Sequence, residues 1–377
     1  MAILAVFLFI IFVLTVLELF ARIYCHKYGK RYVWTPYRSV LLHIDQEALP
    51  RIKPICRFDV NCDGELGSVP PDFNCCRFLT LGGSSTECYY LGSEGSWPTL
   101  LQNKLNEAMS APLSSERVHV GNISKSGFTA RDLGIVIEGV LPNYSKINTV
   151  VLMVGAGDIL NWMKSGTPDF IEESNCITTD LFSVNPRKKF YFKIKHSALY
   201  ELARLRFRRA LKGEEVKYGV GKKLTALREQ RQRAKTILNV TGNPQEMLNN
   251  YERHLFRCIS QLRQINARIL LIPQPWFDRE ANSDEEKNFW NASMGHAFFE
   301  PTDTYYSMKV FRRYMFQIYN RTLEIARKEQ VEAVEVKSNI PCDFKHYYDC
   351  IHFTNLGAEK VAQTIFQYLD KFPHMSN

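Results

Sequence analysis

The chain has 377 residues, of which 45% are hydrophobic, 12% aromatic and 23% charged. This composition supplies a large core, enough for one elaborated α/β domain, and excludes a mainly disordered protein, a collagen-like chain and a coiled-coil rod. Lysine and arginine number 48 and aspartate and glutamate 39, so the net charge is +9. An excess of this size fits nucleic acid, a membrane surface or an acidic polymer, and its position in the chain decides between them.

The chain begins with a long apolar run. Residues 2–17 contain one polar side chain, Thr15, and residues 1–21 are long enough to cross a bilayer core as a helix. No Lys or Arg precedes the run and no small-x-small site follows it, which argues against a cleaved signal peptide. We predict an uncleaved single-pass membrane anchor over residues 1–21. The basic residues that follow favour a cytoplasmic domain, but an exported enzyme requires the reverse, and we slightly prefer the extracytoplasmic side.

The rest of the chain divides into a stem and one domain. Residues 22–76 contain five prolines and little periodicity, which predicts a stem or linker. Residues 77–377 alternate apolar runs with amphipathic segments. The expected strands are 78–81, 117–120, 149–154, 267–272 and 331–336, and the expected helices are 97–109, 129–141, 245–266, 305–329 and 355–372. This alternation predicts an α/β fold with a doubly wound, mainly parallel five-stranded sheet, whose chemistry lies at the carboxyl ends of the strands.

One segment, residues 187–236, breaks the alternation. It carries 17 Lys or Arg and 4 Glu, a net charge of +13, so this segment alone makes the protein basic. A basic helical insertion that is merely solvated is one interpretation. The other is contact with an anionic lipid surface or an acidic polysaccharide, which the interleaved aromatic residues favour. No nucleic-acid recognition motif accompanies the charge, so nucleic acid is not expected as a partner.

Two short motifs carry the chemistry. Ser84 follows the first predicted strand within Leu81-Gly82-Gly83-Ser84-Ser85-Thr86, where a turn into a helix presents a hydroxyl at the edge of the sheet. His352 follows the last strand within Asp349-Cys350-Ile351-His352, where a carboxylate three residues earlier can orient the imidazole as a base for a serine. A second D-x-x-H, Asp343 to His346, precedes it, but only the later pair leads directly into a helix start.

Taken together, these motifs resemble the SGNH/GDSL hydrolase superfamily over about residues 77–370. The segment 82–86 is similar to the family's first block and 349–352 to its last block. The resemblance implies a flavodoxin-like SGNH fold, with Ser84 as nucleophile, His352 as general base and Asp349 orienting His352. It places the oxyanion donors at Ser84, at Ser124 in the second block and at Gly157 in the third block.

Two of the implied oxyanion positions depart from the family pattern. Ser124 stands where the family has glycine, and Gly157 stands where it has asparagine. A serine keeps its backbone N–H, but glycine lacks a side-chain donor, whose loss typically costs about 10²–10³ in turnover. Asn161, one helical turn later, is the available compensating amide, and Gly157→Asn is expected to restore a donor. Asp158 is expected to cap the helix after the third strand.

The resemblance implies a membrane-anchored serine esterase or O-acyltransferase that acts on an O-acylated glycan or a lipid ester. The alternative is an SGNH-fold protein of weak or no activity that binds an acidic polysaccharide or an anionic membrane. Neither a cofactor nor a metal is expected, because the ten cysteines lack zinc-binding spacing. Those cysteines are too few for a disulfide scaffold, and both structural disulfides and buried thiols stay open.

Overall fold

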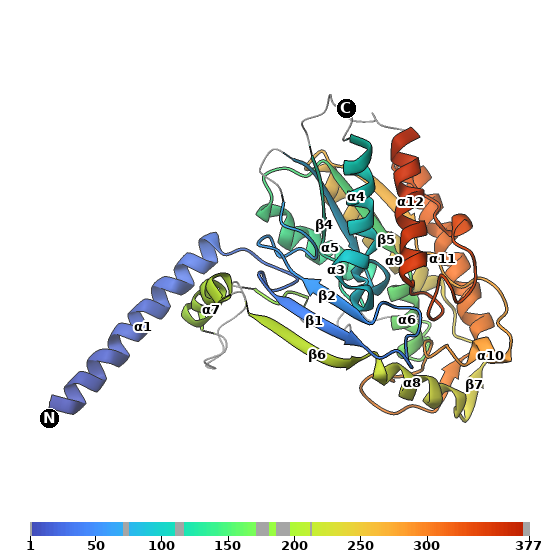
Figure 1. Ribbon diagram of the computed structural model, residues 1–377, viewed down its shortest axis with the longest axis horizontal. Coiled ribbons are helices and arrows are strands. Elements are labelled where there is room, and N and C mark those ends of the chain that lie inside the picture. The colour runs from blue at the N-terminus through green and yellow to red at the C-terminus, as the bar shows by residue number, and fades with distance from the viewer. Residues whose placement is uncertain are drawn as a thin grey trace.

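The computed structural model describes residues 2–70, 75–109, 117–170, 181–185, 197–211 and 213–371. Five parallel strands form its central sheet in the order β10-β8-β5-β3-β4 (Figure 1). In chain order this is the 2-1-3-4-5 arrangement of flavodoxin-like folds. The strands are β3 (Cys76–Gly82), β4 (Val118–Asn122), β5 (Thr149–Val154), β8 (Arg268–Pro273) and β10 (Glu332–Ala333). The expected flavodoxin-like α/β fold is therefore confirmed.

Helices cover both faces of this sheet, so that its strands are buried on both sides. On one face α4 (Trp97–Met109) packs against α12 (Asn355–Lys371), and on the other α5 (Ala130–Val140) packs against α9 (Gln245–Arg263) (Figure 1). All six residues of β5 are buried, as its unbroken apolar run predicts. The remaining helices of the domain's sheet layers are α6 (Ala156–Lys164) and α11 (Met308–Lys328).

Helix boundaries follow local capping signals. Thr129 and Asp132 form a reciprocal capping box at the start of α5, and the Ser307 side chain accepts from the N–H of Val310 at the start of α11. The short elements of the chain are α2 (Ser84–Glu87), α3 (Gly92–Gly95), α10 (Ser283–Glu286), β7 (Thr236–Leu238), β9 (Thr304–Tyr306) and the 3₁₀ turns Tyr89–Leu91, Leu141–Asn143 and Lys337–Asn339. All five strands and five helices expected between residues 77 and 371 are present, with boundaries shifted by a few residues.

The described part of residues 22–76, which the sequence predicts as a stem or linker, contains regular structure packed into the protein. It contains β1 (Ser39–Ile44) and β2 (Ile55–Asp59), which pair antiparallel in a second sheet of order β2-β1-β6. Alternate side chains of these strands are buried in the core of the molecule, including Val40, Leu42 and Phe58. The six-residue alternation of β1 is too short to stand out between prolines, which is why the sequence analysis missed it.

The third strand of this sheet comes from the basic segment. β6 (Glu214–Val220) pairs parallel to β1, between α7 (Ala198–Leu211) and α8 (Lys222–Gln232). Residues 187–196 and 212 lie outside the described residues, and the described remainder of the segment is not the purely helical insertion that the sequence predicts. In α8, Leu224 and Leu227 are buried in the core. The basic segment is therefore partly built into the body of the protein.

Two arginines of α8 bind backbone carbonyls instead of facing solvent. Arg228 donates to the carbonyls of Ala48, Asn288 and Tyr348, at 2.6–3.1 Å. Arg231 donates to the carbonyls of Asn291 and Tyr306, at 2.7 and 2.9 Å. Each guanidinium thus satisfies loop carbonyls of several separate segments. These two cations have a structural role, which reduces the charge of the segment that is available to a partner.

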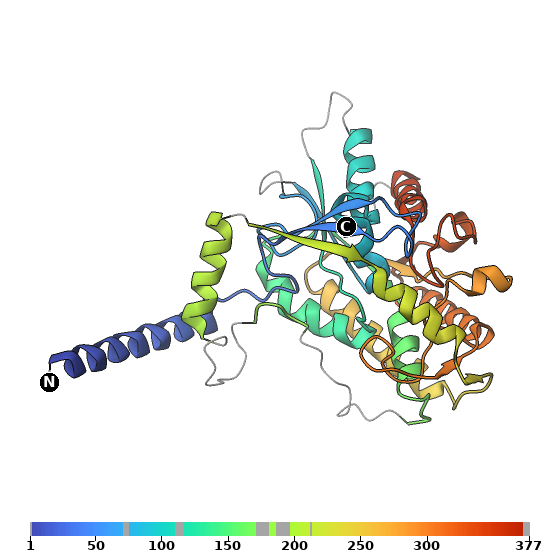
Figure 2. The ribbon, with the colours of Figure 1, turned by 60° about the horizontal axis from the view of Figure 1, so that its bottom comes forward.

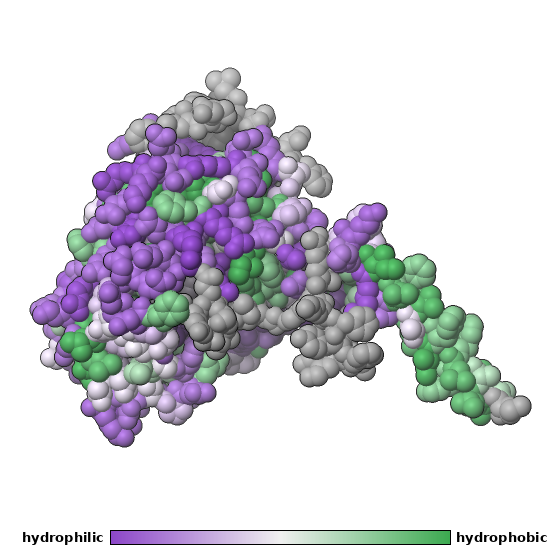
Figure 3. Space-filling view, turned by 180° about the vertical axis from the view of Figure 1, so that it is seen from behind, coloured by the Kyte–Doolittle hydropathy of each residue, from purple (hydrophilic) through white to green (hydrophobic). Residues whose placement is uncertain are grey.

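The N-terminal helix α1 (Ala2–Tyr28) projects away from the domain (Figure 1). It is the one described helix that is long and apolar enough to cross a membrane, with a mean hydropathy of 3.0 over its most apolar 18 residues, none of which is buried. Figure 3 shows this helix as a nearly continuous hydrophobic rod beside a mostly hydrophilic surface. By length and composition α1 fits a membrane span or a signal sequence.

The described cysteines are all free thiols. They are Cys25, Cys56, Cys62, Cys75, Cys76, Cys88, Cys258, Cys342 and Cys350, and Cys176 lies outside the described residues. Burial raises the pKa of Cys56 to about 11 and of Cys88 and Cys258 to about 12. The sequence left structural disulfides and buried thiols open, and the nine described cysteines are thiols.

Candidate active site

Ser84 lies at the carboxyl end of the central strand β3, in the turn that begins α2. Gly82 ends the strand, and a β-carbon there would lie 2.6 Å from the carbonyl oxygen of Met153 in β5, so only glycine fits this close approach. The hydroxyl of Ser85 then donates to the carbonyl of Ile351 at 3.0 Å. This contact ties the Ser84 turn to the loop that holds the second predicted motif.

Asp349 and His352 lie in the loop between β10 and α12, and the structure brings both to Ser84. His352 Nε2 lies 2.6 Å from Ser84 Oγ, and His352 Nδ1 lies 2.7 Å from Asp349 Oδ2. The other carboxylate oxygen of Asp349 accepts the N–H groups of Ile351 and His352, each at 2.9 Å. The three predicted side chains therefore form one continuous hydrogen-bonded chain.

The environment of Asp349 keeps it ionised. Burial by itself would raise the pKa of this carboxyl, since none of its side chain is exposed. The charge and hydrogen bond of His352 and the two backbone N–H groups outweigh burial, so the pKa of Asp349 lies below its usual range. A buried carboxylate of this kind can fix one tautomer of the imidazole and stabilise its protonated form.

The second D-x-x-H pair has the same internal geometry without the serine. His346 Nδ1 lies 2.8 Å from Asp343 Oδ1, a distance close to that in the Asp349–His352 pair. Among the described residues no hydrogen bond links His346 to a serine hydroxyl, and Asp343 is partly exposed. The internal spacing of the motif therefore cannot distinguish the pairs, but the position of Ser84 does.

Two aromatic rings flank His352, and the sequence analysis identified neither. The ring of Tyr348 lies parallel to the imidazole at 5.3 Å between centroids, and that of Trp290 lies parallel at 6.3 Å. The indole N–H of Trp290 donates to Asp349 Oδ2 at 2.8 Å, the same oxygen that faces His352 Nδ1. Trp290 comes from the long connection between β8 and α11, and no local motif marks it.

Changing Trp290 to Phe tests this contact, because it keeps a ring beside His352 and removes the N–H. We expect turnover of a small activated ester to fall by about 10-fold, since a charged acceptor loses one of its donors. Trp276→Phe is the matched control, because the indole N–H of Trp276 donates to Asp278 at 3.0 Å, away from the triad. Equal loss in both variants would assign the effect to packing.

Ser124 does not present its N–H to the site as expected. Its N–H donates to Asn122 Oδ1 at 3.0 Å, and the residue is fully buried. Further along the same loop, the N–H of Lys125 donates to the carbonyl of Gly82 at 3.3 Å, which holds the loop against the Ser84 turn. Gly127 is the exposed glycine of this loop, with φ of +84°. The N–H of Ser124 is therefore already bonded within the loop.

The buried carboxylate of Glu87 binds the loop that contains Ser126 and Gly127. Glu87 Oε2 accepts the N–H of Ser126 at 2.5 Å and also its hydroxyl. Burial raises the pKa of Glu87, although the bonds from Ser126 and the charges of Lys125 and His352 oppose this shift. Glu87 is a third residue of the site, after Tyr348 and Trp290, that no sequence motif predicted. Its position next to the Ser84 turn couples that turn to the loop carrying Gly127.

Gly157 lies in the first turn of α6, directly after β5. A β-carbon there would lie 2.1 Å from the carbonyl oxygen of Phe128, so the backbone of the Gly127 loop occupies the space of any side chain. Asn161 is exposed, one turn further along α6, and shows no bond into the site among the described contacts. The first N–H groups of α6 have no intrahelical acceptor and lie at the carboxyl edge of the sheet.

Asp158 caps a different helix from the one expected. Both of its carboxylate oxygens accept the N–H of Ala130 at 3.2 Å, so this side chain caps the start of α5 and not that of its own helix α6. Burial raises the pKa of Asp158 to about 7. The bond fastens the third-block segment to the helix that follows the Gly127 loop.

The chain is similar to known proteins in structure but not detectably in sequence. No protein-family model and no curated protein sequence matches the chain. Similar solved structures include an acetylxylan esterase from Geobacillus stearothermophilus, with 14% identity, 78% of this chain and 95% of that chain covered and a TM-score of 0.40. They also include the acetyl xylan esterase AlAXEase, with 13% identity, 78% and 99% covered and a TM-score of 0.41. A putative lipolytic protein of the G-D-S-L family from Desulfitobacterium hafniense has 11% identity, 77% and 98% covered and a TM-score of 0.40.

Proposed function

We propose that this protein is a serine esterase or O-acyltransferase in which Ser84, His352 and Asp349 form the catalytic triad. One observation carries the proposal: His352 bonds Ser84 Oγ through Nε2 at 2.6 Å and Asp349 through Nδ1 at 2.7 Å. Nucleophile, base and orienting carboxylate stand in the order that acyl transfer through serine requires.

In the proposed reaction Ser84 Oγ attacks the carbonyl carbon of an ester while its proton passes to His352 Nε2. The tetrahedral intermediate collapses as His352 returns that proton to the leaving alcohol oxygen, which leaves an acyl group on Ser84. A water molecule or an acceptor hydroxyl then attacks the acyl group, again with His352 as base. Asp349 stays ionised throughout and stabilises the protonated imidazole.

The oxyanion is stabilised in this proposal by backbone N–H groups of Ser84, Gly127 and Gly157. Gly127 replaces Ser124, because the N–H of Ser124 is bonded to Asn122. The Gly157 N–H at the start of α6 replaces the side-chain amide that the family has at this position. A site with one fewer side-chain donor predicts lower turnover than a complete oxyanion hole, which keeps a non-catalytic binding protein as the second candidate.

We further propose that α1 is retained as a membrane anchor, and that the substrate is an O-acylated glycan or a lipid ester. The contact between α1 and α7 supports retention. Glu18 of α1 accepts bonds from Ser197 Oγ and from the N–H groups of Ala198 and Leu199, at 2.6–3.0 Å. Cleavage of α1 would leave these donors at the start of α7 without their acceptor.

A fluorophosphonate probe tests the proposed nucleophile directly, because it reacts with an activated serine and requires no knowledge of the substrate. We expect the wild-type protein to be labelled at Ser84, and the variants Ser84→Ala and His352→Ala to remain unlabelled. Ser85→Ala is the matched control, since the Ser85 hydroxyl is bonded to the Ile351 carbonyl and has no imidazole partner. Absence of labelling in a folded wild-type protein would favour the binding-protein candidate.

A further inference from the structure

Helix α7 is fixed at the end of the apolar part of α1. Three donors at the start of α7 bind the single carboxylate of Glu18, which also pairs with Arg22 at 2.7 Å. On the α1 side, Ala21 and Cys25 are buried at this crossing. Figure 2 shows α7 running across α1 near its C-terminal end. If α1 spans a membrane, α7 therefore lies at the level where the helix leaves it.

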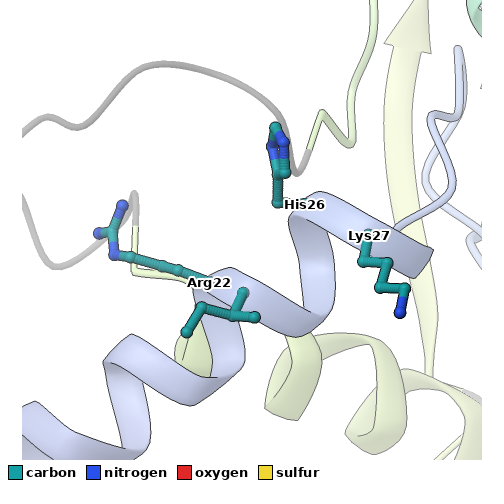
Figure 4. Close-up of a pocket in the computed structure, with 4 residues that line it drawn as sticks. Arg22, His26 and Lys27 are labelled. Atoms are coloured by element: carbon teal, nitrogen blue, oxygen red, sulfur yellow. The ribbon is translucent and has the colours of Figure 1, made fainter.

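The chemistry of α1 changes at this crossing. Large apolar side chains are exposed along α1 from Ile3 to Phe20. Beyond this stretch a pocket lies against α1, and its lining contains three basic side chains, Arg22, His26 and Lys27, together with Ile23 (Figure 4). Arg22 pairs with Glu18, so Lys27 is the lysine or arginine of this lining that can meet lipid phosphates directly after the apolar span.

Helix α7 continues this pattern on its free face. At 3.6 residues per turn Tyr200, Ala203 and Phe207 share one face of α7. Arg204 lies on one flank of this face, where it also pairs with Glu201 at 2.7 Å, and the exposed Arg206 lies on the other. Tyr200 is 48% and Phe207 64% exposed, although both are large aromatic residues. An aromatic stripe between arginines is typical of helices that lie in the interface plane of a bilayer.

Four other cations of the basic segment are bonded within the protein. Arg228 and Arg231 are bonded to backbone carbonyls, and Arg233 and Lys235 pair with Glu229 and Asp303. In Figure 1 the end of β6 and α8 lie at the far side of the domain from α1. Lipid headgroups at the end of the apolar part of α1 would meet α1 and α7 together.

We propose that α7 is an interfacial helix that binds anionic phospholipid headgroups through Arg204 and Arg206, with Tyr200 and Phe207 inserted between them. The inference rests on the proposed retention of α1 as an anchor. The hydrogen bonds of Glu18 to the start of α7 then hold α7 parallel to the membrane plane. The result is a second attachment that fixes how the domain stands on the membrane, which a single helix and a flexible stem would not do.

Hydrogen–deuterium exchange of the full chain in lipid nanodiscs tests this placement. We compare discs of phosphatidylcholine with discs that also contain phosphatidylglycerol. Exchange of α7 amides should slow by roughly tenfold in the anionic discs, and Arg204→Gln with Arg206→Gln should remove this difference. The double variant Arg233→Gln with Lys235→Gln removes the same charge elsewhere in the basic segment and should keep it.

The exchange of α1 separates failure of this inference from failure of the anchor. If α1 amides are protected in both discs and α7 exchanges equally in both, the anchor stands and the interfacial role of α7 is wrong. If α1 amides are unprotected, the anchor proposal fails and this inference fails with it. Slower exchange of α7 with a soluble acidic polysaccharide, and not with anionic discs, would assign the surface to glycan binding. Phe207→Ser, which keeps both arginines, should weaken the protection and report on insertion of the ring.

Discussion

If the proposed triad operates, we expect replacement of His352 with Ala to abolish hydrolysis of a small activated ester, with a loss of about 10⁴-fold or more in kcat. Among the described residues the imidazole is the one group bonded to Ser84 Oγ, so its removal leaves the hydroxyl without a base. Ser84→Ala should give a loss of similar size, and the double variant should be no worse than either single variant, because the residues act as a unit.

His346→Ala provides a matched control within the same chain. His346 bonds Asp343 at 2.8 Å in the same D-x-x-H spacing, on the same loop and six residues earlier. Its removal should leave kcat within about twofold of the wild-type value, because a partly exposed ion pair contributes little to stability and does not contact Ser84. Loss of turnover in His346→Ala with full turnover in His352→Ala would reverse the assignment of the base.

The central sheet and the triad were predictable because each depends on short-range pattern. The unbroken apolar run of β5 indicates a strand buried on both faces. The D-x-x-H spacing lets the aspartate carboxylate bond the imidazole three residues later in the same loop. Parallel strands then bring the ends of β3 and the final loop to one edge of the sheet. Local motifs combined with topology were therefore enough to bring Ser84, Asp349 and His352 together.

The second sheet was not predictable from such patterns, because its strands pair over long sequence separations. Ser39 lies opposite Glu214, and both strands have short or mostly exposed patterns. Long sequence separation also hides the role of Arg228. Its charge predicts a surface contact, but the side chain binds the carbonyls of Ala48, Asn288 and Tyr348. Composition counts the charges of a segment, but only the fold shows which of them are already bonded.

Within the site, the sequence predicted the three side chains that the structure brings together and missed the groups that hold them. Trp290 reaches Asp349 from a loop 59 residues away, and no spacing rule connects the two. Ser124 matched its block by position, but the side chain of Asn122, two residues earlier, already binds its N–H. Supporting contacts of this kind depend on side-chain orientation, and alignment to a motif does not contain that information.

Replacing Gly157 with Asn is now expected to destabilise the protein, contrary to the restored donor that the family pattern predicts. The β-carbon of any residue at this position would lie 2.1 Å from the Phe128 carbonyl oxygen, which is backbone and cannot rotate away. Overpacking of this kind costs about 1–3 kcal/mol, and we expect Tm to fall by about 2–5 °C. Gly157→Ala should lose about as much, because the clash arises at the β-carbon.

Turnover should fall together with Tm, because the displaced carbonyl follows directly on Gly127, the proposed oxyanion donor of this loop. Gly213→Ala is the control, since no atom lies within 4 Å of a β-carbon at that exposed glycine. A Gly157→Asn variant with unchanged Tm and higher kcat would show that the loop yields and that the amide reaches the oxyanion. Lower Tm and lower turnover in both Gly157→Asn and Gly157→Ala would instead mean that the Phe128 backbone fills the space of the asparagine side chain in the SGNH/GDSL pattern. An oxyanion at this site would then depend on backbone donors.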